Sequence, residues 1–294
     1  MLDIALLLGL AFIYTFQSLF AKLFSDQYTG EAKFSSPVFS VIYGATIGLL
    51  NLIMSGFVYQ PSLATFLLGL GNAVVLFLFN WGLIEGSRRG PYSFLMICTL
   101  SGAILVPLFF FRILGLEHIS WIQAIGVIMM LGAFVLLNLK KESQKAKKSF
   151  YLWILLLFFV NGFYSVFLSL QTRIMNGAER SEMLVTTFLF SGVISAIYLL
   201  SQSRKKFIST FRMKPKALIF ALSSCVCATG AANLVLYLYS TDLSNTVINA
   251  THQGGILVFS VIMSMILFKE KLNWKQMVGA LVAVAAVVLL NLNF

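Results

Sequence analysis

The chain is organised as long apolar runs separated by short polar connections. Each run holds roughly 20 residues, the length at which an α-helix crosses a hydrocarbon core about 30 Å thick. The runs are continuously apolar and do not alternate with polar positions, which argues against a transmembrane β-barrel. We therefore predict ten membrane-spanning helices, over residues 2–24, 36–55, 63–86, 91–111, 119–139, 150–172, 183–201, 216–240, 244–267 and 273–292.

Composition supports an all-α membrane protein. Hydrophobic residues make up 59% of the 294 residues and charged residues only 11%. Ordinary soluble domains are about 45–50% apolar and about 25% charged. Since no long polar segment interrupts the apolar runs, we expect no separate soluble domain.

The positive charges are unevenly distributed over the predicted loops. Of the 21 Lys and Arg residues, 18 fall on one side of the predicted membrane, and only Arg112, Arg173 and Arg180 fall on the other. By the positive-inside rule the basic loops are cytoplasmic, which places both termini outside a cytoplasmic (inner) membrane. The net charge of +11 is then a topology signal near anionic lipid, and we expect no nucleic-acid partner.

The sequence is similar to itself at an offset of 153 residues. Residues 117–126 (EHISWIQAIG) align without a gap with 270–279 (EKLNWKQMVG), so that Glu, Trp, Gln and Gly coincide. At the same offset, residues 136–139 align with residues 289–292, both of sequence LLNL, and Asn80 aligns with Asn233. Coincidence of these polar and small residues in one register indicates an internal repeat.

The repeat predicts how the chain is divided. We expect a first five-helix repeat at 1–139, a basic linker at 140–149 and a second repeat at 150–294. Because five is an odd number, the second repeat is upside down in the membrane relative to the first. Inverted-topology repeats are typical of secondary transporters, whose substrate site lies near the bilayer midplane and opens to either side in turn.

The repeated motif has the form of a helix start. Ser120-x-x-Gln123 and Asn273-x-x-Gln276 fit a capping box, in which two side chains satisfy the free amides of a first helical turn. Glu117 and Glu270 precede these starts, where a negative charge suits the positive end of the helix dipole. We therefore interpret the two glutamates as structural.

With these residues the chain resembles the ten-helix EamA-type branch of the drug/metabolite transporter superfamily. Glu270-Lys-Leu272, Gln276 and Gly279 match the pattern with which each half of that family ends; Glu117-His-Ile119, Gln123 and Gly126 match it with Ile for Leu. The resemblance covers essentially the whole chain. It implies an uncoupled, proton-coupled or exchange-driven carrier of small organic solutes, a class that includes amino acids, sugars, nucleotide sugars, quaternary amines and drugs.

Polar and aromatic residues inside the predicted spans are candidates for substrate binding, because such residues are costly in lipid. The candidates are Tyr14, Gln17, Asn80, Trp81, Asn161, Tyr164, Asn233, Asn249, His252 and Gln253. Asn80 and Asn233 have a second interpretation, as hydrogen bonds between neighbouring helices. His252 is either a neutral hydrogen-bonding residue or the carrier of a coupling proton.

The absence of charged residues from the centres of the predicted spans narrows the range of candidate substrates. No Asp or Glu lies in the middle third of a predicted span, and Glu85 is close enough to Arg88 and Arg89 to form an ion pair. A neutral, polar and aromatic cavity favours a neutral or zwitterionic metabolite such as an amino acid; the alternative is a quaternary amine held by cation–π contacts.

No cluster of residues with catalytic or metal-binding spacing is evident. We therefore expect a transporter and not an enzyme, with no catalytic residue, metal or cofactor. The expected partners are a small-molecule substrate, the lipid bilayer and protons as a candidate coupling ion, in a monomer or homodimer.

Overall fold

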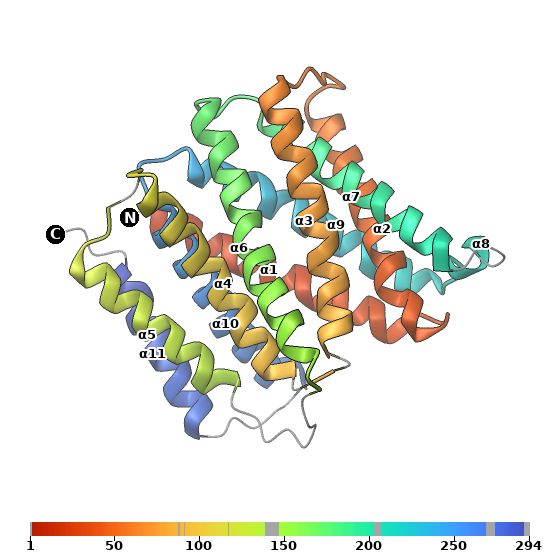
Figure 1. The fold of residues 1–294 in the computed structure, drawn as a ribbon. Helices are drawn as coiled ribbons and strands as arrows, with labels where there is room; N and C mark the ends of the chain where they lie inside the picture. Colours follow the sequence, from red (N-terminus) through yellow and green to blue (C-terminus); the bar gives the residue numbers. More distant parts are fainter. Residues whose placement is uncertain are drawn as a thin grey trace. The chain divides into compact units, whose positions relative to one another are not determined.

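The structure is a computed structural model that describes residues 2–87, 89–90, 92–116, 118–138, 147–202, 207–268 and 274–290. These residues form eleven helices and no strand (Figure 1). The helices are α1 (Leu2–Gln27), α2 (Ala32–Met54), α3 (Leu63–Ser87), α4 (Tyr92–Ile113), α5 (Trp121–Asn138), α6 (Phe150–Ile174), α7 (Arg180–Gln202), α8 (Phe207–Thr210), α9 (Pro215–Tyr239), α10 (Asn245–Phe268) and α11 (Trp274–Leu290).

Each of the ten predicted segments coincides with one helix, and α8 is an additional helix of four residues. Among the described residues, seven helices are long and apolar enough to cross a membrane: α1, α2, α3, α4, α6, α7 and α9. The helices α5 and α11 are apolar but shorter. The chain is therefore a helical multi-pass membrane protein.

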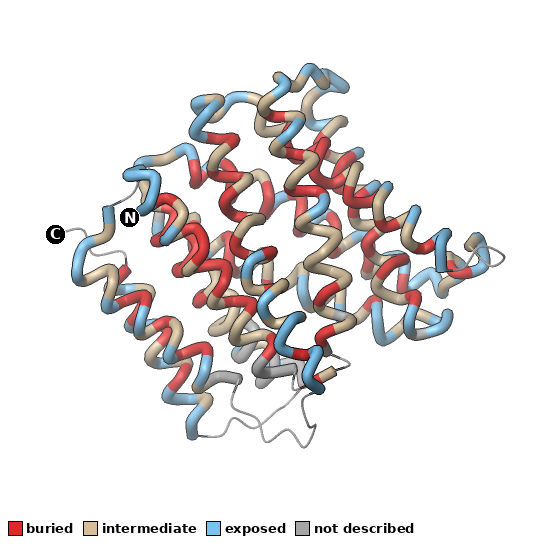
Figure 2. The backbone as a smooth tube through the Cα atoms, in the orientation of Figure 1, coloured by how far each residue is buried: buried red, intermediate tan, exposed pale blue. Residues whose placement is uncertain are grey.

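The chain folds into two compact units. Unit 1 comprises residues 1–15, 85–166 and 241–294, and unit 2 comprises residues 16–84 and 167–240. Each unit thus takes segments from both halves of the sequence, and three helices (α1, α3 and α6) contribute residues to both units. Most of the longer helices carry both buried and exposed residues (Figure 2), whereas residues 245–252 of α10 are all buried.

In unit 2, α2 and α7 pack closely and run antiparallel. A Cβ atom added to Gly44 would lie 2.6 Å from the backbone nitrogen of Gly192, and one added to Gly48 would lie 2.5 Å from the side chain of Leu189. Residue numbers therefore rise along α2 as they fall along α7. Only glycine allows backbones this close, so these positions determine the contact between the two helices.

In unit 1, α5 and α11 are also antiparallel neighbours (Figure 1). A Cβ atom on Gly126, near the start of α5, would lie 2.9 Å from the side chain of Leu290, at the end of α11. The core between them includes the fully buried Met130 and Phe134. In the same unit, a Cβ atom on Gly255 of α10 would lie 2.6 Å from the Cβ atom of Ala11, so this glycine lets α10 approach α1.

Two local predictions are confirmed. The backbone amide of Ser120 donates to Oε1 of Gln123 at 3.2 Å, and the amide of Gln123 donates to Oγ of Ser120 at 3.3 Å, which completes the capping box before α5. Glu85 forms its ion pair with Arg89. The remaining motif residues Glu117, Glu270 and Asn273 lie outside the described residues.

Candidate functional site

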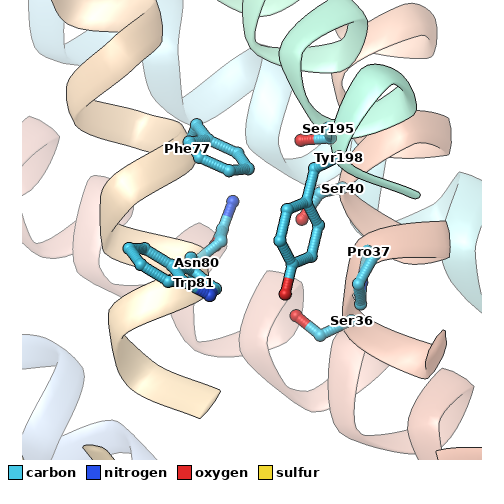
Figure 3. Close-up of a pocket in the computed structure, with 8 residues that line it drawn as sticks. All are labelled: Ser36, Pro37, Ser40, Phe77, Asn80, Trp81, Ser195 and Tyr198. Carbon is cyan, nitrogen blue, oxygen red and sulfur yellow. The ribbon is translucent and has the colours of Figure 1, made fainter. Parts of the chain in front are cut away.

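A pocket lies among three helices of unit 2 (Figure 3). Its lining residues are Ser36, Pro37 and Ser40 from α2, Phe77, Asn80 and Trp81 from α3, and Ser195 and Tyr198 from α7. Spacings of three or four residues place the members of each set on one face of their helix. Asn80 and Trp81, both predicted from the sequence, are therefore brought together in one site.

Three aromatic rings line the pocket, two from α3 and one from α7 (Figure 3). The rings of Phe77 and Trp81 are stacked, with centroids 6.4 Å apart and an interplanar angle of 10°. Tyr198 faces both from α7, at 5.7 Å from Phe77 and 6.4 Å from Trp81 (Figure 3). Aromatic faces bind apolar groups and also attract cations through their quadrupole.

The remaining lining is polar but uncharged. None of the described residues in the lining carries a charge. The side chain of Ser195 is 1% exposed, and its Oγ has no hydrogen-bond partner among the described residues. A buried hydroxyl without a partner costs free energy, so this group is available to a water or a ligand in the pocket.

The pocket is narrow in this conformation. About 10 Å³ of its volume admits a water-sized group, which is room for one water molecule. A ligand larger than a water molecule would therefore need the lining side chains to move apart.

A second pair of predicted residues meets in unit 1. The rings of Tyr14 and His252 lie 5.5 Å apart with an interplanar angle of 30°. His252 is buried, and its Nδ1 lies 3.2 Å from the carbonyl oxygen of Ile248, one turn earlier on α10. A proton on Nδ1 would donate to this oxygen and leave Nε2 as an acceptor. Near this pair on α10, Asn249 is fully buried and Gln253 is half-buried.

Other predicted residues bind neighbouring helices. Nδ2 of Asn161 donates to the carbonyl oxygen of Thr99 at 2.9 Å, which joins α6 to α4 in unit 1. Nε2 of Gln17 donates to the hydroxyl of Tyr43 at 3.0 Å, which joins α1 to α2 in unit 2. Tyr164 is half-buried on α6. The role of these residues in substrate binding remains a prediction.

Asn233, the repeat counterpart of Asn80, has a different environment. Its Nδ2 donates to Oδ1 of the fully buried Asn51 at 2.8 Å. This bond joins α9 to α2, in agreement with the second interpretation of Asn233, as a residue that hydrogen-bonds a neighbouring helix. Asn80 lines the pocket of unit 2 instead.

Sequence reasoning missed six of the eight lining residues: Ser36, Pro37, Ser40, Phe77, Ser195 and Tyr198. A signal existed in the spacing of Ser36 with Ser40 and of Ser195 with Tyr198, which places each pair on one helix face. Serines at such spacings are also common in helix packing, so the signal alone does not distinguish a pocket from an interface.

The fold and this pocket define a helical multi-pass membrane protein with a small polar and aromatic site among its helices. Residues 148–292 match the family described as the EamA-like transporter family, within the drug/metabolite transporter superfamily. This segment nearly coincides with the predicted second repeat, and it is a domain of that family of membrane transporters. No curated protein matches the chain at a significant level.

The fold also occurs in a solved structure described only as "Crystal structure of protein". It matches with a TM-score of 0.74 and 14% sequence identity, over 98% of this chain and 96% of that chain. At this identity the likeness shows the fold alone.

Proposed function

We propose that the protein is a secondary transporter with ten membrane spans arranged as two inverted five-helix repeats. The antiparallel packing of α2 on α7 and of α5 on α11 supports this, because the sequence repeat makes each pair equivalent. A two-fold axis in the membrane plane turns equivalent helices in opposite directions, whereas an axis along the membrane normal would leave them parallel.

The uncharged polar and aromatic pocket of unit 2 is the observation that carries the substrate proposal. Asn80 and Ser195 offer hydrogen bonds to a polar group, while Trp81 offers a flat apolar face. With no charge in the described lining, the site favours a small neutral or zwitterionic metabolite such as an amino acid. Closure of the rings over the pocket is expected of a carrier, which occludes its site as it alternates between the two sides.

The three aromatic rings of the pocket favour a second candidate substrate, an organic cation such as a quaternary amine. Tryptophan is the aromatic residue that binds cations best, and a cation–π contact contributes about 0.5–2 kcal/mol. Phe77, Trp81 and Tyr198 present three rings to one space.

The two candidates are tested with the purified protein in two steps. A thermal-shift screen against amino acids, quaternary amines, nucleosides and sugars identifies the class that binds, because a ligand of the folded state raises the apparent melting temperature. Exchange of the radiolabelled hit across liposomes then measures transport. We expect Trp81→Ala to raise the KM for exchange about tenfold, the effect of losing roughly 1.4 kcal/mol of cation–π or stacking contact.

The matched control is Trp121→Ala, since Trp121 is 88% exposed at the start of α5 and is not among the residues that line the pocket. It should leave the KM unchanged. For a cation, Trp81→Phe should retain only part of the affinity, whereas for an amino acid Asn80→Ala should have the larger effect. Equal KM values for Trp81→Ala and Trp121→Ala would show that the substrate binds elsewhere.

A further inference from the structure

Unit 1 contains an apolar groove that is separate from the pocket described above. The groove has a volume of about 300 Å³ and lies between α1, α10 and α11. Its lining side chains are all aliphatic or aromatic. For comparison, an apolar cavity of about 150 Å³ can stay free of water and bind a small hydrocarbon, because water needs polar partners that such a cavity lacks.

Each wall of the groove extends over one helical turn. Ile4 and Leu8 line it from α1, and Val284 and Val288 line it from α11. Residues four positions apart are neighbours on a helix face, about 6 Å apart along the axis. These four side chains are 38–55% exposed, so the groove is open along the helices to the surroundings of the protein.

Gly255 of α10 also lines the groove. Gly255 is buried, and a Cβ atom there would lie 2.6 Å from the Cβ atom of Ala11. The glycine therefore allows close packing of α1 on α10 and adds no side chain to the groove. A space lined by hydrocarbon from three helices fits an apolar chain better than a polar ligand.

We infer that this groove binds one acyl chain of a bilayer phospholipid. The helix α1 is long and apolar enough to span the membrane, so the medium around its exposed face is lipid hydrocarbon. An acyl chain needs no hydrogen-bonding partner, and in contact with Leu8 and Val284 it gains the van der Waals attraction that an empty groove would forfeit. The chain would bridge α1 and α11, beside the helix pair that holds Tyr14 and His252.

The test uses the full-length protein in phosphatidylcholine vesicles that contain a phosphatidylcholine with a photoreactive diazirine in one acyl chain. After irradiation, labelled peptides are quantified by mass spectrometry. We expect labelling to concentrate on residues 2–15 and 274–290. Val284→Trp should fill the groove and lower this labelling to the level of the other exposed apolar faces, because the indole ring would take the place of the acyl chain.

Val193→Trp is the matched control, because Val193 on α7 is 52% exposed and Val284 is 50% exposed. This variant should keep the wild-type labelling. If Val284→Trp does not elute as a monodisperse protein, Leu8→Trp fills the same groove from α1. Labelling spread evenly over the exposed apolar faces, or crosslinking of two protein copies through the groove, would overturn the inference. Neither result depends on transport activity.

Discussion

Glu179 joins the ends of two helices in unit 2. It precedes α7 with a φ of 55°, in the left-handed region that few residues other than glycine adopt. Its Oε2 accepts hydrogen bonds from the amide of Ser62 at 2.9 Å and from the hydroxyl of Ser62 at 2.8 Å, just before α3. Partial burial tends to raise the pKa of Glu179, but the hydrogen bonds from Thr65 and Ser62 together lower it below its usual value.

This direction predicts how stability depends on pH. Because folding lowers the pKa, the stabilisation by Glu179 is complete above the unfolded-state pKa of about 4.3 and is lost as the pH falls through the lower, folded value. We expect Glu179→Gln to lower the melting temperature at pH 7 and to reduce the loss of stability between neutral and acid pH. Glu182→Gln, in the first turn of α7, serves as control and should keep the wild-type profile. An unchanged profile in Glu179→Gln would contradict this role.

At the scale of elements, glycine positions decide which helices can approach. Gly44 faces the backbone of α7, whereas no atom lies within 4 Å of a Cβ atom added to Gly230 of α9. Both residues lie within helices of unit 2 and have similar sequence surroundings of small and apolar residues. Substitutions at these two positions can therefore be compared to separate the effect of helix packing from the intrinsic effect of glycine on helix stability.

We expect Gly44→Ala to destabilise the protein by about 1–3 kcal/mol, because the new methyl group would have to push α2 away from α7. Gly230→Ala should be neutral or stabilising by up to about 1 kcal/mol, since alanine has the higher helix propensity. Unfolding in sodium dodecyl sulfate, followed by circular dichroism, measures both. Equal effects of the two substitutions would show that the α2–α7 contact is not tight in the membrane.

At the scale of the whole molecule, the sequence repeat and the compact units divide the chain differently. The repeat separates residues 1–139 from 150–294, whereas each compact unit combines segments of both halves. Helices that the proposed repeat makes equivalent pack on each other within one unit, as α2 does on α7 and α5 on α11. Neither half thus contains the full set of packing partners, and we infer that both halves are needed for folding.

The proposed topology places the basic loops in the cytoplasm. Lys145 lies in the basic linker, and Ala178 lies in the connection between α6 and α7 on the opposite side. In intact cells, a membrane-impermeant thiol reagent should label Ala178→Cys but not Lys145→Cys. After the membrane is permeabilised, both should react. Labelling of Lys145→Cys but not of Ala178→Cys in intact cells would show that the orientation is the reverse of the one proposed.

The positions of the helices were predictable because they depend on local properties of the chain. An apolar run of sufficient length must form a helix in lipid, where backbone groups need partners within the segment. The capping box of Ser120 with Gln123 and the ion pair of Glu85 with Arg89 were predictable for the same reason, since their partners are three or four residues apart.

The sequence by itself determined the class of protein and the places of its helices. The tertiary structure alone decided which polar residues meet. It brings Ser195 and Tyr198 of α7 to Asn80 and Trp81 of α3, and it pairs Asn233 with Asn51 while Asn80 lines the pocket. The physical reason is that contacts between helices depend on how closely the backbones approach, and this is determined by small residues such as Gly44 and Gly192 far apart in the chain.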